Sequence, residues 1–142
     1  MPNQLGKLFR VMARRYNKAL APFDITSVQA NILATLWVEA PGGGMTIGEL
    51  QARMMLGSST LTGAVDRMER AGLLRRLPVE NDRRAYRLQP VTWPAKKAEA
   101  LIETLAKTED EVFRGLTGAE RRTLGLLLEK ALGPLAEEDD DE

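Results

Sequence analysis

The chain has 142 residues, of which 44% are hydrophobic and 28% are charged, and its formal net charge is zero. This length and composition fit one soluble globular domain with a buried core rather than a disordered chain. The chain contains no cysteine and no histidine, which excludes disulfides, thiol and imidazole catalysis and the usual zinc ligands, so we expect no metal and no cofactor.

The first half of the chain predicts three helices. Apolar residues recur at three- and four-residue spacing over residues 3–20, which predicts the first helix. A capping box at residues 26–29 predicts a second helix that ends near Glu39. The Pro-Gly-Gly-Gly run at residues 41–44 predicts a loose loop without regular structure. A second capping box at residues 46–49 predicts a short third helix.

A fourth helix is expected to begin at Ser58, directly after Leu56-Gly57, and to end at Ala71-Gly72. Two helices that meet at such a tight turn are typical of a helix-turn-helix. The inward face of the fourth helix is predicted to carry Leu61, Val65 and Met68. Its opposite face carries Ser59, Thr60, Thr62, Gly63, Asp66, Arg67 and Arg70. Small polar residues and glycine lower helix propensity, so this face is predicted to lie close against another surface.

A basic β-hairpin is predicted next. Residues 73–77 and 84–88 form its expected strands and residues 78–82 its turn, and Pro78 places the hairpin at a sheet edge. A long helix is expected from Thr92, with Pro94 in its first turn, to Gly115.

A third capping box at residues 117–120 predicts a last helix that ends at Gly133-Pro134. Residues 137–142 are all acidic and are expected to form a disordered tail.

The zero net charge hides an uneven distribution of charge. Residues 53–97 carry ten basic side chains against four acidic ones, and residues 1–23 carry five basic side chains and no acid. This asymmetry favours a nucleic-acid partner for part of the surface. The N-terminal stretch has no uninterrupted apolar core and no apolar run reaches the ~18 residues that span a bilayer. We therefore expect a cytoplasmic protein without a signal peptide or membrane contact.

Two motifs give the sequence a specific resemblance. Residues 58–76 read SSTLTGAVDRMERAGLLRR, and residues 81–92 read NDRRAYRLQPVT. A reading helix of this pattern, followed at this spacing by an Asp-x-Arg wing, resembles the MarR family of bacterial winged-helix regulators over roughly residues 5–135. The chain departs from the family pattern at Trp93, which we expect to pack on a neighbouring core, and in its loop at residues 42–44.

The resemblance implies a mainly α fold with a small β-wing, in which the N- and C-terminal helices form a dimerisation domain. The implied boundaries are residues 1–25 and 93–136 for the dimerisation region and residues 26–92 for the winged helix-turn-helix. It also implies a homodimer that binds a pseudo-palindromic operator in double-stranded DNA and acts as a transcriptional repressor. Two-fold symmetry then predicts half-sites spaced by ~10 bp.

The resemblance places the reading helix in the major groove and the wing in the minor groove. Arg67 and Arg70 either read guanine, hold phosphate, or pair with Asp66 or Glu69. Arg84 is the expected wing-tip arginine, fixed or simply paired by Asp82, and Arg83 is its alternative. The expected DNA-binding residues are Ser58, Ser59, Thr60, Thr62, Gly63, Arg67, Arg70, Arg75, Asp82, Arg83 and Arg84. Arg76 and Arg87 are further phosphate candidates.

The resemblance also implies a small aromatic or phenolic effector, for which Met12, Tyr16 and Trp37 are candidate lining residues, although each also fits an ordinary core. The basic residues of the first helix fit a solvated face better than a DNA contact. The alternative function is a winged-helix protein-interaction module without specific DNA binding. No nucleophile–base pair or metal constellation is visible, so the sequence predicts that the protein is not an enzyme.

Overall fold

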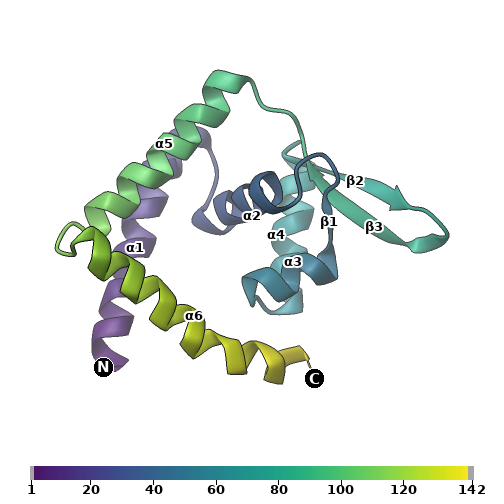
Figure 1. The fold of residues 1–142 in the computed structure, drawn as a ribbon. Coiled ribbons are helices and arrows are strands. Elements are labelled where there is room, and N and C mark those ends of the chain that lie inside the picture. The colour runs from purple at the N-terminus through teal and green to yellow at the C-terminus, as the bar shows by residue number, and fades with distance from the viewer. Residues whose placement is uncertain (1, 141–142) are drawn as a thin grey trace. The chain divides into compact units, whose positions relative to one another are not determined.

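The computed structural model describes residues 2–140 and consists mainly of helices with one small sheet (Figure 1). In chain order the elements are α1 (Pro2–Leu20), a 3₁₀ helix (Ala21–Phe23), α2 (Ser27–Glu39), β1 (Met45–Thr46), α3 (Ile47–Met54), α4 (Ser58–Arg70), β2 (Leu74–Val79), β3 (Asp82–Pro90), α5 (Ala95–Val112) and α6 (Gly118–Asp140). The predicted mainly α fold with a small β-wing is confirmed.

The chain divides into two compact units. The central unit is Thr26–Pro94 and contains α2, α3, α4 and the sheet. The terminal unit combines the chain up to Ile25 with the chain from Ala95, and it contains α1, α5 and α6.

Capping boxes fix the starts of three helices, as the sequence predicts. At α2, the Thr26 hydroxyl accepts a hydrogen bond from the Gln29 backbone N–H at 3.3 Å, and the Gln29 side chain accepts one from the Thr26 N–H at 3.0 Å. The same reciprocal pair of bonds starts α3 at Thr46 and α6 at Thr117. Each box satisfies two N–H groups that the helix itself leaves without partners.

The inward face of α4 is the one that the sequence predicts. Leu61, Val65 and Met68 are completely buried, and so are Leu33 of α2 and Leu50 of α3. Since α4 contacts both of those helices, this face anchors α4 in the core of the central unit. Its opposite face is left at the surface.

The sheet has three antiparallel strands in the order β1-β3-β2. The sequence predicts only two strands, because β1 is two residues long and directly follows a run of glycines. Met45 of β1 pairs with Leu88 of β3, and both are buried. β1 therefore joins the hairpin to the start of α3.

The predicted turn of the hairpin is too long. β2 continues through Pro78 to Val79 and β3 begins at Asp82, so the turn shortens to Glu80 and Asn81. Asn81 adopts a positive φ of 67°, which asparagine tolerates better than most residues. Pro78 fits inside β2 because β2 is an edge strand and pairs only with β3. Figure 1 shows the hairpin extending as a ribbon away from α2, α3 and α4.

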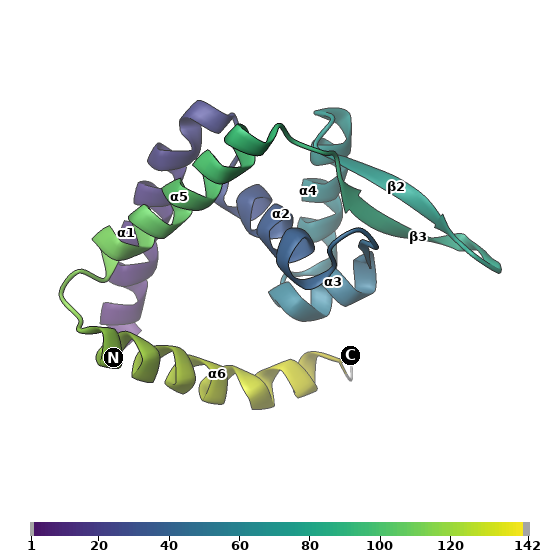
Figure 2. The same ribbon diagram turned by 45° about the horizontal axis from the view of Figure 1, so that its top comes forward.

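In the terminal unit, α1 and α5 lie side by side (Figures 1 and 2). An ion pair of 3.7 Å joins Arg15 of α1 to Glu111 of α5. A second one, of 2.6 Å, joins Arg121 of α6 to Asp110. Large apolar side chains remain exposed in this unit at Leu5, Phe9, Ile102, Leu126, Leu127, Leu128, Leu132 and Leu135.

In the terminal unit, the predicted start of α5 and the predicted end of α6 are wrong. α5 begins at Ala95, so Pro94 precedes the helix instead of lying in its first turn. α6 does not end at Gly133-Pro134 but continues to Asp140 with Pro134 inside it. A proline removes one backbone donor, and the rest of the helix ladder continues past it here. The predicted disordered tail is therefore helical over residues 137–140, while residues 141–142 lie outside the described part of the chain.

Candidate nucleic-acid interface

The outer face of α4 begins with small polar residues at the helix N-terminus. Ser58, Ser59, Thr60 and Thr62 are all exposed. The N-cap is Gly57, and no side chain caps the first backbone N–H groups of the helix. These donors and hydroxyls can meet an anionic or hydrogen-bonding surface, because helix N-termini carry a partial positive charge.

Gly63 is half-buried in the middle of this face, and the side chain of Arg67, one turn further along α4, occupies the space beside it. A Cβ atom at Gly63 would lie 3.3 Å from Nη1 of Arg67. The Arg67 guanidinium therefore extends back along α4 over Gly63, toward the small polar residues of the first turns. The absence of a side chain at Gly63 makes room for a cation on the outer face.

Arg76 of β2 connects the hairpin to α4. Its Nη2 lies 2.7 Å from Oδ1 of Asp66, and its Nε lies 2.8 Å from Oε2 of Glu69. The same guanidinium stacks 4.4 Å from the ring centroid of Tyr86 on β3. Arg76 thus holds the reading helix against the wing and neutralises both acids of α4. It is not free for phosphate.

The pairing of Arg67 or Arg70 with the acids of α4, which the sequence leaves open, does not occur. Asp66 and Glu69 pair with Arg76 instead. Within the described part of the chain, Arg67 and Arg70 make no ion pair and no side-chain hydrogen bond, and both are exposed. Their charges therefore face solvent without compensation.

The other phosphate candidates separate into two kinds. Arg87 lies 3.6 Å from Oε2 of Glu49 and donates a 3.5 Å hydrogen bond to the carbonyl oxygen of Gly44. Arg75 donates from Nε and Nη2 to the side-chain oxygen of Gln89, at 2.8 and 2.5 Å. Since Gln89 is neutral, Arg75 keeps its full charge at the surface while Arg87 is partly compensated.

At the wing tip, Asp82 acts on the backbone of Arg84. Its Oδ1 accepts a 3.0 Å hydrogen bond from the Arg84 backbone N–H. Among the described side chains, Asp82 makes no ion pair with Arg84, so the expected side-chain contact is replaced by a turn contact of the Asx type. Arg83 and Arg84 are both exposed.

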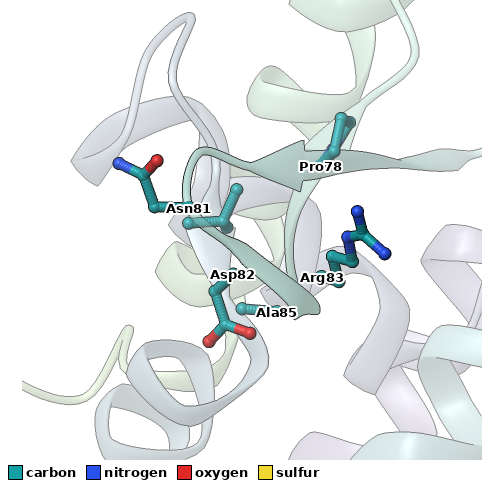
Figure 3. A pocket seen from close by; sticks show the side chains of 6 residues that line it. Pro78, Asn81, Asp82, Arg83 and Ala85 are labelled. Carbon is teal, nitrogen blue, oxygen red and sulfur yellow. The ribbon is translucent and has the colours of Figure 1, made fainter.

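A hollow of about 330 Å³ lies beside this tip (Figure 3). Figure 3 shows the Asp82 carboxylate and the Arg83 guanidinium pointing to different sides of the hairpin. The residues that line the hollow are Pro78, Val79, Asn81, Asp82, Arg83 and Ala85.

The positive charge that these ion pairs leave uncompensated is concentrated on α4 and the hairpin. The central unit contains eight arginines and six acidic residues. Ion pairs join Glu39, Glu49, Asp66 and Glu69 to arginines. Within the described part of the chain, the arginines left without an acidic partner are Arg67, Arg70, Arg75, Arg83 and Arg84. All of them are exposed, and all lie on α4 or on the hairpin.

The predicted effector residues are distributed over both units. Met12 and Tyr16 of α1 are half-buried, and burial, helped by the charge of Glu109, raises the pKa of the Tyr16 hydroxyl. Trp37 of α2 packs edge to face on Trp93, with ring centroids 5.5 Å apart and planes at 76°, as expected for Trp93. An effector site at these residues remains a prediction.

Neither metal-binding clusters nor membrane spans occur in the described part of the chain. Its Asp and Glu side chains form no group that could hold a metal ion. None of its helices is both long and apolar enough to cross a bilayer.

The helix-turn-helix, the exposed arginines and the antiparallel wing define a winged helix-turn-helix protein. The sequence profile of the MarR family matches residues 25–86. The multiple antibiotic resistance protein MarR of Salmonella typhimurium is 30% identical over 133 residues, covering 90% of each chain. The HTH-type transcriptional regulator PecS of Dickeya dadantii is 28% identical over 127 residues, covering 87% of this chain and 76% of PecS.

The fold comparison points to the same family. A cysteine-to-serine mutant of MarR from Escherichia coli, solved in complex with operator DNA, superimposes with a TM-score of 0.75 at 26% identity over 92% of each chain. The chain belongs to the MarR family of transcriptional regulators. The predictions of a DNA-binding winged helix and of a protein that is not an enzyme are confirmed.

Sequence reasoning missed the residues that hold the interface together. The role of Arg76 as a connector was missed, and so were the contacts of Gln89 and the close approach of Gly44 to β3. One signal was available for Arg76. Asp66 and Glu69 lie three residues apart on the same side of α4, shortly before a strand that contains two arginines. For Gln89 and Gly44 no local signal exists.

Proposed function

We propose that the protein is a homodimeric repressor that binds a pseudo-palindromic operator through its central unit and acts in the cytoplasm, where the bacterial chromosome lies. The observation that carries this proposal is the set of five exposed, uncompensated arginines on α4 and the hairpin. Cations gathered on a reading helix and a wing neutralise phosphates, which supplies most of the affinity of such proteins for DNA.

In the proposed complex, α4 enters the major groove and the hairpin follows the backbone into the minor groove. The small residues Ser59, Thr60 and Thr62 let the helix approach the bases, and their hydroxyls and methyls can meet base edges. Arg67 and Arg70 contact bases or phosphates beside them. Arg84, with Arg83 as its alternative, supplies the cation that a narrow minor groove attracts.

The exposed apolar side chains of the terminal unit support a homodimer. Eight large apolar residues of α1, α5 and α6 are exposed, among them Phe9 at 73% and Leu126 at 66%. Soluble proteins seldom leave so much apolar surface uncovered. A second copy of the same unit covers it, and two-fold symmetry then sets half-sites at ~10 bp spacing.

Repression and release by a small aromatic or phenolic effector extend the proposal. An effector that binds near Met12, Tyr16 or Trp37 changes DNA affinity only if it favours one arrangement of the two central units over another. The half-buried aromatic rings of Tyr16 and Trp37 support an aromatic ligand.

Selection of DNA tests the proposal directly. The full-length protein is incubated with a library of random duplexes, bound duplexes are sequenced, and the enriched duplex is titrated at several salt concentrations. We expect an inverted repeat and a steep fall of log affinity with log salt, since each neutralised phosphate contributes a slope of about −0.9.

Two results would contradict the proposed function. Enrichment of no sequence would favour the alternative of a protein-interaction module. A flat salt dependence would show that the arginine surface does not contact phosphates.

A further inference from the structure

A hydrogen-bonded chain crosses the sheet from the glycine loop to the outer strand. Arg75 of β2 and Gln89 of β3 are directly paired in the ladder. The Gln89 side-chain oxygen accepts from Nε and Nη2 of Arg75, and the Gln89 side-chain nitrogen donates to the carbonyl oxygen of Gly42 at 2.8 Å. Three segments of the chain are therefore joined through one amide.

The two ends of this amide fix each other's orientation. A carbonyl oxygen can only accept, so the NH₂ group of Gln89 must face Gly42. The amide oxygen must then face β2, where it meets two donors of the Arg75 guanidinium. The Gly42 carbonyl thus determines, through Gln89, which side of the Arg75 fork is used inside the protein.

The remaining donors of Arg75 stay available. Both N–H groups of Nη1 and the second N–H of Nη2 are not used by Gln89. Arg75 is exposed, and its only partner in the described part of the chain is neutral. Arg76 and Arg87, by contrast, bind carboxylates.

We propose that Gln89 is a positioning residue for DNA binding, which holds the Arg75 guanidinium, uncompensated and preoriented, for a backbone phosphate. The proposal rests on the proposed function, since it needs the hairpin to lie on DNA. A free arginine loses rotamer freedom when it binds, and a restrained arginine has lost much of it beforehand. A glutamine does this without removing the charge that the phosphate needs.

Three variants of the full-length protein separate orientation from charge. Gln89→Met keeps the length of the side chain, removes its three hydrogen bonds to Arg75 and Gly42, and leaves the charge of Arg75. Gln89→Glu keeps an acceptor for Arg75 but neutralises it. Arg75→Ala removes the cation. The probes are the selected duplex and a scrambled duplex, titrated over a range of salt concentrations.

We expect Gln89→Met to weaken binding to both duplexes about three- to tenfold, with an unchanged salt slope, because only ordering is lost. Gln89→Glu and Arg75→Ala should each reduce the magnitude of the salt slope by about one, which corresponds to the loss of one phosphate contact. In the Arg75→Ala background, Gln89→Met should have no further effect, since its role acts through Arg75.

Thermal unfolding of each variant reveals any general loss of structure. Binding by Gln89→Met in the Arg75→Ala background then distinguishes positioning from a structural role. If Gln89→Met weakens the Arg75→Ala protein as much as it weakens the parent, its effect is structural and the inference is wrong. Binding by Gln89→Met that equals that of the parent also overturns it. If the parent itself selects no duplex, the proposed function fails, and that outcome is seen before any variant is made.

Discussion

At the scale of single residues, the arginines of the central unit differ in what they contact. Arg76 binds two carboxylates and an aromatic ring. Arg67 and Arg70 of the reading helix have no such partners in the described part of the chain. Because Asp66 and Glu69 already pair with Arg76, they leave the charges of Arg67 and Arg70 available for a ligand.

Replacing Arg76 should therefore cost both stability and DNA affinity. Arg76→Gln is expected to lower the free energy of unfolding by about 1–2 kcal/mol, since the two ion pairs are partly exposed and the aromatic contact adds a similar amount. Urea unfolding measures this loss. Arg53→Gln, which breaks one exposed ion pair with Glu39, is the control and should cost less than half as much. Equal losses in the two variants would show that Arg76 is an ordinary surface residue.

The wing and the reading helix should respond differently to mutation. Arg84→Ala is expected to weaken binding to the selected and the scrambled duplex alike, by about tenfold, and to lower the salt slope by about one. Fluorescence anisotropy titrations at several salt concentrations measure both quantities. An unchanged affinity would mean that the wing tip does not touch DNA.

Thr62→Ala should change the sequence preference instead, by about 1 kcal/mol at one base pair, because Thr62 faces base edges in the proposed complex. Repeating the duplex selection with this variant measures the change. Thr62→Ser keeps the hydroxyl and removes the methyl, so it shows which group is read. Identical selected sequences for all three proteins would exclude Thr62 from readout.

At the scale of elements, the sequence predicts a loose glycine loop, but in the structure this loop is bound closely to the sheet. Gly44 is buried and has a positive φ of 70°. A Cβ atom there would collide with the backbone carbonyl oxygen of Leu88. With Gln89 held to Gly42, the loop sets where β1 meets β3 and how Gln89 is oriented.

Gly44→Ala should consequently destabilise the central unit. The positive φ and the collision together are expected to cost about 2–4 kcal/mol. Gly43→Ala is the matched control, since nothing lies within 4 Å of a Cβ atom at that position and its φ is not positive. Thermal and urea unfolding compare the two. A Gly44→Ala protein as stable as the Gly43→Ala protein would show that β1 does not approach β3 this closely.

At the scale of the whole molecule, we propose that two central units share one operator, because a single unit would offer few contacts to specify it. The exposed leucines of α6 offer a means of joining two copies. Linking two binding units raises the effective concentration of the second one at its half-site. In the proposed homodimer, specificity therefore depends on the terminal unit as much as on α4.

Charging the α6 surface should separate the copies. The double variant Leu126→Glu with Leu127→Glu is expected to sediment as a monomer and to lose at least about hundredfold in affinity for the full operator. Val38→Glu, at a position that is 79% exposed in the central unit, is the control and should sediment as the parent does. Sedimentation velocity, with circular dichroism to verify helix content, decides between these outcomes. An unchanged sedimentation coefficient in the double variant would place the dimer contact elsewhere.

The sequence by itself determined the features that depend on near neighbours along the chain. Capping boxes place the starts of α2, α3 and α6, because donor and acceptor lie three residues apart. The buried face of α4 follows from helical spacing. The motifs at residues 58–76 and 81–92 were enough to identify the family, since their residues lie at fixed spacing.

Only the tertiary structure decided which side chains meet across longer separations. Several acids were available to each arginine, and the structure assigned Asp66 and Glu69 to Arg76. β1 exists because β3 pairs with it, and Gln89 meets Gly42 across 47 positions. Such contacts depend on how the backbone folds back on itself, and no local spacing encodes that path. In the described part of the chain, the five arginines that remain exposed without an acidic partner, and that we propose contact DNA, are the result of those assignments.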